Sequence, residues 1–252
     1  MNMTKKDTSQ MPKRIITYLI GVYLTSVAIA ISKMTPLGIS PNSSLPNEIS
    51  LILGKNLGFI TAIVFSCFVF IQWILLGKDF KIINFIQVLL SIIYGFFVNF
   101  SVSLVNRVLP PCDTYPMQLV YTIISALLLG AAIDVYLAPK VMALPAEGLA
   151  QAVATRFKIP FPRAKNTCDI TIVTISVILS FIFFKSLYGI REGTIIHAIL
   201  VGRAVKWSDK LFGKQLNRFL WGNEGVTRDI GKDINEKIEE EIAESMELEE
   251  VK

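Results

Sequence analysis

The chain has 252 residues, a formal net charge of +5, 52% hydrophobic residues and a mean hydropathy of +0.54. This composition excludes an ordinary soluble domain and is typical of membrane proteins with several spans. One histidine and three scattered cysteines favour neither a zinc site nor a disulfide framework, so we expect no metal and no cofactor.

The first half begins with a polar, basic segment, residues 1–14, expected in the cytoplasm. The first span is predicted over 15–32, where Gly21 would let another helix approach closely, although small residues are common in membrane helices anyway. Residues 36–53 are apolar but contain three prolines and a glycine. They predict either a re-entrant turn with a half-helix or an amphipathic loop at the surface. Two further spans follow, at 57–76 and 82–105.

The second half begins after a proline-rich outer turn, residues 110–116. A fourth span is predicted over 117–138. The long connection 140–167 carries a second broken piece, 143–148, and prolines that would stop a helix. A fifth span is expected over 168–187.

The sixth span is predicted over 189–207. It is an apolar stretch with glycines at both ends, and it carries ionisable groups that would face a protein interior or a water-filled cavity. Residues 208–222 have bases at steps of four opposite rings and leucines, which predicts an amphipathic helix at the membrane interface. Residues 223–252, with 11 acids and 4 bases, form an acidic cytoplasmic tail. Its isoleucines at steps of four predict a helix that docks on a protein partner, or else a solvated tail.

The basic residues predict the orientation. Sixteen lie in the segments assigned to the inside and five in those assigned to the outside. This bias puts both termini in the cytoplasm of a multi-pass protein of the bacterial cell (inner) membrane.

The two halves follow one plan. Leu37-Gly-Ile-Ser-Pro-Asn42 aligns with Met142-Ala-Leu-Pro-Ala-Glu147 at an offset of 105, and Gly95 aligns with Gly202 at 107. The fold class expected is therefore an all-α membrane bundle of about six transmembrane helices with Pro/Gly-broken segments, built from repeats 15–106 and 117–207. Because each copy has an odd number of spans, the copies would be inverted, as in many transporters.

Three motifs resemble those of the YczE/YitT-like bacterial integral membrane proteins. They are the Leu37-Gly-Ile-Ser-Pro41 sequence, its echo before Glu147, and the run from Gly189 to Gly202. The resemblance covers about residues 14–207 and implies fold and location but no substrate. Ala143, Arg191 and Glu192 depart from the residues common in that family.

The preferred function is transport of an unknown small solute. The candidate binding residues are the polar groups of the broken segments and span ends: Asn42, Asp134, Glu147, Asp169, Glu192, Thr194, His197 and Arg203. Each could instead be solvated or structurally hydrogen-bonded. The alternative is an accessory or substrate-capture subunit of a larger membrane complex. We expect no enzyme, since familiar catalytic motifs are missing, and no nucleic-acid partner, since the bases lie at membrane borders.

Overall fold

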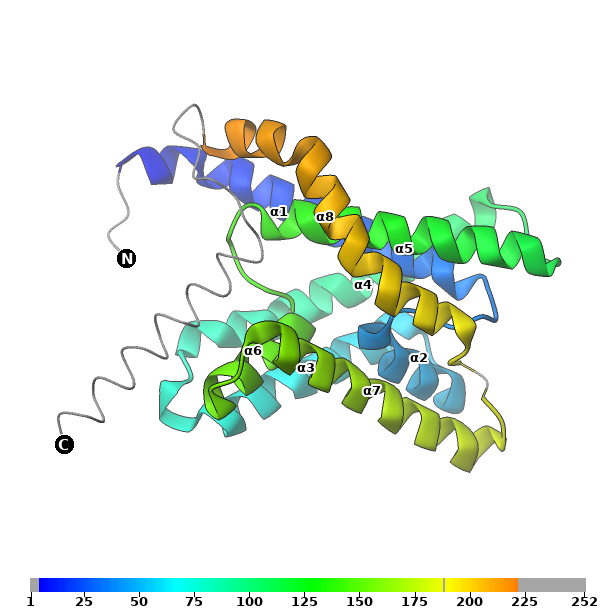
Figure 1. The fold of residues 1–252 in the computed structure, drawn as a ribbon. Coiled ribbons are helices and arrows are strands. Elements are labelled where there is room, and N and C mark those ends of the chain that lie inside the picture. The colour runs from blue at the N-terminus through cyan, green and yellow to red at the C-terminus, as the bar shows by residue number, and fades with distance from the viewer. Residues whose placement is uncertain (1–4, 188, 222–252) are drawn as a thin grey trace.

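The computed structural model describes residues 5–187 and 189–221, and they form a bundle of α-helices (Figure 1). The all-helical class is as the sequence predicts. Within the described residues the helices are α1 (Lys5–Lys33), α2 (Pro41–Leu53), α3 (Leu57–Leu76), α4 (Ile86–Val108), α5 (Tyr115–Leu137), α6 (Pro145–Phe157), α7 (Phe161–Phe184) and α8 (Glu192–Trp221), with two 3-10 turns, η1 (Gly77–Asp79) and η2 (Ile82–Phe85), before α4.

Five helical stretches of the described chain are long and apolar enough to cross a membrane. They are Met11–Lys33, Leu57–Asp79, Ile82–Val108, Tyr115–Leu137 and Phe161–Phe184. By helix length and composition the chain is thus a multi-pass membrane protein. The sequence predicts about six spans, one more than this. The missing one is the sixth predicted span, which falls in α8. There Glu192, Arg203 and Lys206 leave no apolar stretch of span length.

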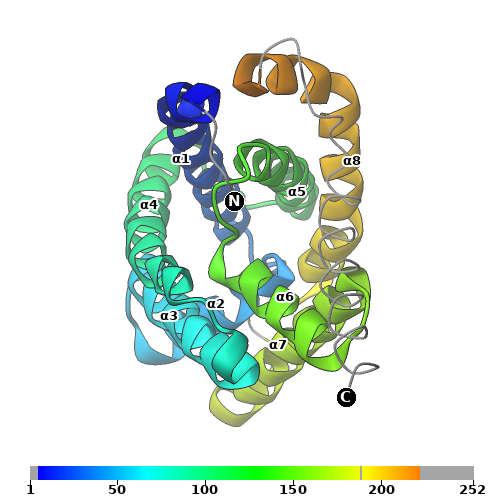
Figure 2. The same ribbon diagram turned by 90° about the vertical axis from the view of Figure 1, so that its left-hand side faces the viewer.

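Helix α8 packs along α5, and its two ends also approach α1 and the residues just after it. At its beginning, the Gly193 amide donates to the Leu37 carbonyl at 2.8 Å, just beyond the C-terminal end of α1. At its end, the Trp221 ring centroid lies 4.4 Å from Arg14 Cζ, in the first half of α1. Residues 208–221 of the predicted interfacial helix continue α8 without a break, after a bend that both views show (Figures 1 and 2).

Two helices begin earlier than the sequence predicts. The segment expected to precede the membrane belongs to α1 from Lys5 onward, and Arg14 is buried. Its guanidinium donates to the Pro139 carbonyl at 2.9 Å and the Lys140 carbonyl at 3.3 Å, so it joins α1 to the end of α5. Helix α7 starts at Phe161, seven residues before the predicted fifth span. Proline is accepted in a first turn, where its missing N–H has no helical partner to lose. The acidic tail lies outside the described residues.

The two broken segments each contain a helix of 13 residues, α2 and α6. At about 1.5 Å per residue each is about 20 Å long, shorter than the hydrocarbon layer of about 30 Å. Both begin at a proline, Pro41 and Pro145, whose fixed φ suits the first helical position. Both end at a residue in the left-handed conformation, Gly54 and Lys158. Six of the 13 residues of α2 and seven of the 13 residues of α6 are buried, so the first segment is a helix packed on its neighbours and not a loop.

Each of these half-helices packs across the two halves of the chain. Helix α2 contacts α3 and α7, and α6 contacts α7 and α3. The longer helices α1 and α5 pack together, with α4 on α1 and α8 on α5 (Figure 2). Helices α3 and α4 cross so closely that a Cβ added to Gly58 would lie 1.9 Å from the Gly95 carbonyl oxygen. Over the described part of the chain, α7 and α8 form no comparable pair.

The proline-rich turn 110–116 lies at the opposite end of α1 from Lys5. Cys112 Sγ donates to the Met34 carbonyl at 2.8 Å, next to the last residue of α1. The small residues of α1 face α5, since a Cβ on Gly21 would lie 2.5 Å from the Tyr136 backbone nitrogen. This face is therefore used inside the protein.

Candidate functional site

The first turns of the two half-helices meet in the interior of the protein. Asn42 is the second residue of α2 and Glu147 the third of α6. Asn42 Nδ2 donates to Glu147 Oε1 at 3.1 Å, although the two residues are 105 positions apart. The two helices thus approach each other with their amino-terminal ends, which carry unpaired N–H groups and the positive end of the helix dipole.

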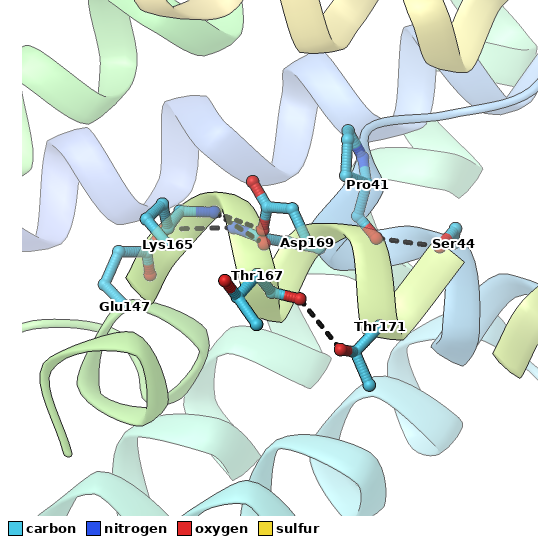
Figure 3. A network of polar contacts seen from close by, with 8 residues as sticks. Pro41, Ser44, Glu147, Lys165, Thr167, Asp169 and Thr171 are labelled. Carbon is cyan, nitrogen blue, oxygen red and sulfur yellow. Dashed lines mark hydrogen bonds and ion pairs between the residues drawn. The ribbon is translucent and has the colours of Figure 1, made fainter. Parts of the chain in front are cut away.

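Helix α7 adds a cation and a second carboxylate to this contact. Lys165 Nζ donates to Asn42 Oδ1 at 2.9 Å and to Asp169 Oδ1 at 2.5 Å. Lys165 and Asp169 are one helical turn apart, so both side chains lie on the same face of α7. Figure 3 shows Glu147, Lys165 and Asp169 together beside the beginning of α2. We call Asn42, Glu147, Lys165 and Asp169 the central polar cluster.

The central polar cluster is reachable from outside on the α7 side. The side chains of Lys165 and Asp169 are 23% and 25% exposed, and Asn42 and Glu147 are half-buried. A solute could exchange hydrogen bonds with these groups without unfolding a helix. Two carboxylates, one ammonium and one amide can bind a small polar solute through both donors and acceptors.

Two electrostatic effects oppose each other at Glu147. Burial raises the pKa of the Glu147 carboxyl above its usual value, and the nearby Lys165 ammonium works in the other direction. Burial likewise raises the pKa of Glu48, further along α2. Neither α2 nor α6 is among the five candidate spans. The pKa of Glu147 therefore depends on how closely Lys165 approaches it.

Two buried tyrosines lie within electrostatic reach of Glu147. Tyr18 of α1 and Tyr136 of α5 are 2% and 1% exposed, with ring centroids 6.1 Å apart in an edge-to-face contact. Neither hydroxyl has a well-formed hydrogen bond within the described residues. Buried hydroxyls are normally paired, and the Tyr136 hydroxyl interacts with the Glu147 carboxyl, so this tyrosine adjoins the central polar cluster.

The other predicted site residues do not join this cluster. Asp134 is buried near the end of α5, where its Oδ2 accepts from the Ser208 hydroxyl of α8 at 2.8 Å. Thr194 is buried against Gly38, and its hydroxyl has no hydrogen-bond partner among the described residues. Both sites hold α8 in place and do not contact the half-helix ends.

His197 joins α8 to α5. It is 1% exposed, its Nδ1 lies 2.8 Å from the Gly193 carbonyl, and its Nε2 lies 3.1 Å from Ser125 Oγ. A carbonyl accepts only, so Nδ1 carries the proton in the neutral ring and the Ser125 hydroxyl donates to Nε2. With both nitrogens used, the contacts are those of a structural histidine.

Glu192 and Arg203 lie at the surface. Glu192 pairs with Arg191 at 3.1 Å, and both side chains are about two-fifths exposed, at 39% and 43%. Arg203 is exposed. Exposed pairs of this kind contribute little to stability, and neither residue approaches the central polar cluster.

Sequence reasoning missed several residues of this interior. Lys165 was counted only as a base of the inner connection, and Glu48 and the two tyrosines were not singled out. The spacing of Lys165 and Asp169, one turn apart before an apolar run, was the available signal.

Within the described residues no three histidine, cysteine or acidic side chains gather as a metal site. A surface hollow of about 380 Å³ on α8 is lined by Lys214, Gln215, Arg218 and Phe219.

One protein-family model matches residues 12–210 of the chain, and it is described as a family of unknown function (DUF6198). No curated protein and no solved structure matches the chain.

Proposed function

We propose that this chain, which belongs to the DUF6198 family of unknown function, transports a small polar solute that binds in the central polar cluster. The observation that carries the proposal is the hydrogen bond between Asn42 and Glu147. It joins the amino-terminal ends of two half-helices inside a membrane bundle. Half-helix ends at such a junction are where many transporters bind their solutes.

The proposal includes an inverted duplication of three spans each. Two sets of equivalent contacts support it. Helix α2 contacts α7, and its counterpart α6 contacts α3. Helix α4 packs on α1, and its counterpart α8 packs on α5. The equal length of the two half-helices supports it as well. On this plan α8 is a sixth crossing, since its two ends reach opposite ends of α1. The YczE/YitT-like resemblance belongs to the same proposal.

Helix α8 can cross in spite of its charges. Bases near the end of a membrane helix can extend their side chains to the headgroups. Trp221 and Phe219, which lie against Arg14 and Lys13, mark the interfacial end of the helix. With the excess of basic residues there, that end and both chain termini lie in the bacterial cytoplasm.

The cluster suits binding and release more than chemistry. Its groups hydrogen-bond one another across three helices, so a solute that replaces those bonds alters contacts between α2, α6 and α7. A bound solute can thereby shift the balance between two packings of the bundle. We assign no reaction to the site and classify the protein as a transporter, not an enzyme.

The alternative role is an accessory or substrate-capture subunit. It needs a surface for a protein partner, and the small residues of α1 and the acidic tail are the candidates. Gly21, Ala28 and Ala30 are packed inside the protein, and the tail lies outside the described residues. Transport by the chain alone is therefore favoured.

The test is uptake into proteoliposomes that contain only this protein. A panel of labelled amino acids, amines, sugars and small carboxylates is screened with wild-type protein. For any solute that the wild type takes up, Glu147→Gln should reduce the uptake rate at least about tenfold, because it removes the charge that contacts the solute. Glu192→Gln, in the exposed pair, is the matched control and should leave uptake unchanged. A solute taken up equally by wild type and Glu147→Gln would overturn the proposed site.

A further inference from the structure

A second buried carboxylate lies outside the central polar cluster. Glu48, on α2, has an exposed fraction of 0%. Neither of its carboxylate oxygens receives a well-formed hydrogen bond within the described residues. The Ser180 hydroxyl of α7 lies near the carboxylate, but it donates its proton to the Ser186 carbonyl at 2.8 Å. A charged carboxylate buried with so little compensation is costly, and such groups take up a proton instead.

The chain before α8 covers Glu48 directly. A Cβ added to Gly189 would lie 2.3 Å from Glu48 Oε2 and 3.1 Å from Asn47 Nδ2. The next residue, Ile190, forms an antiparallel bridge with Gly38. In this packing Glu48 is not exposed to solvent, and Gly189 lies directly over its carboxylate near the end of α1.

The charges around Glu48 do not compensate it. Lys33 donates to Asn47 Oδ1 at 3.0 Å, one residue away. The other charged side chains on the elements that adjoin α2 at this end are Lys55, Lys185, Arg191 and Glu192. Burial is the main cause that raises the pKa of the Glu48 carboxyl, and none of these charges contributes to it.

We propose that Glu48 is a proton-binding site, occupied in the closed packing seen here and emptied when α2 moves away from Gly189. The inference rests on the proposed transport function, for which it supplies the coupling ion. A sodium ion is less suitable, because hard cations take several oxygen ligands. The neighbours offer one hydroxyl, Ser180, and Asn47 presents its amide nitrogen towards Gly189.

Helix α2 connects this proton site to the solute site. Asn42 and Glu48 are six positions apart on the same helix of 13 residues. Between them, the hydroxyls of Ser44 and Ser176 lie 3.2 Å apart and join α2 to α7. Loss of the proton leaves a charge that favours a hydrated, open position of α2. The same movement displaces Asn42 from Glu147, which couples the two sites through one rigid element.

The experiment measures modification of the wild-type protein by dicyclohexylcarbodiimide. This apolar reagent forms stable adducts with protonated carboxyl groups shielded from water. The protein is labelled in liposomes across a pH series, in sodium or potassium buffer, and the adducts are located by peptide mass spectrometry. Glu192 serves as an internal exposed carboxyl. Glu48→Gln is the matched variant, since it removes the carboxyl that the reagent modifies.

We expect an adduct on Glu48 that falls about tenfold for each pH unit above its midpoint, in both buffers, with none on Glu192. Glu48→Gln should lose this adduct and leave any others unchanged. No adduct on Glu48 at any pH would overturn the proposal. Sodium that removes the adduct at constant pH would also overturn it, in favour of a metal-ion site. Because labelling needs no solute, these outcomes are separate from the uptake assay that tests transport.

Discussion

Asn42 Nδ2 donates to Glu147 Oε1 at 3.1 Å, and this one bond joins the first turns of α2 and α6. The two residues occupy aligned places in the two halves of the chain, as the inverted duplication that we propose would require. The bond lies in the proposed solute site, and α2 connects it to Glu48.

A double-mutant cycle should detect this bond in the free energy of unfolding. Asn42→Ala and Glu147→Gln should each weaken it, and their effects should be non-additive by about 0.5–1.5 kcal/mol. The measurement is unfolding in detergent followed by tryptophan fluorescence. Strictly additive effects would mean that the two side chains do not interact in the folded protein.

The close crossing of α3 and α4 predicts a large difference between two glycines. Gly58→Ala should destabilise the protein by about 1–3 kcal/mol, because the new Cβ would lie 1.9 Å from the Gly95 carbonyl oxygen. Gly202→Ala in α8 is the control. A Cβ there meets nothing within 4 Å, and alanine favours the helix by about 0.5–1 kcal/mol. Equal melting temperatures of the two variants in thermal unfolding would contradict this packing.

His197 should prove to be a structural residue. His197→Ala removes the bonds to Gly193 and Ser125 and leaves a cavity between α5 and α8, so it should cost about 2–4 kcal/mol. Ser125→Ala should cost less, about 1 kcal/mol. Solute affinity measured on the folded fraction of each variant should match that of wild type. A His197→Ala protein of normal stability with lost affinity would place His197 in the solute site.

Glu48 should make stability depend on pH. Burial raises the pKa of its carboxyl above the usual 4.5. The folded state then holds a proton that the unfolded state has released, so stability falls as pH rises from about 4.5 through the folded-state pKa. Glu48→Gln should flatten this decline, and Glu192→Gln should not. Melting temperatures recorded over a pH series provide the measurement. Equal slopes in wild type and Glu48→Gln would contradict a buried, proton-binding Glu48.

The sequence could predict the helices and the broken segments because both rest on local physics. Apolar runs of span length and prolines are visible without contacts, and the offset of 105 placed Asn42 opposite Glu147. The sequence could not show that Lys165 and Asp169 belong to the same cluster, because this depends on how α7 packs against α2. It also misplaced the beginning of α7, since Pro162 can open a helix as readily as Pro160 can end one.

The most direct test of the account is the structure of the protein with the solute identified by uptake. We predict density in contact with the Asn42 amide and the Glu147 carboxyl, which then bind the solute in place of each other. Solute density elsewhere, for instance in the hollow beside Lys214 and Arg218 on α8, with the Asn42–Glu147 bond intact, would contradict it.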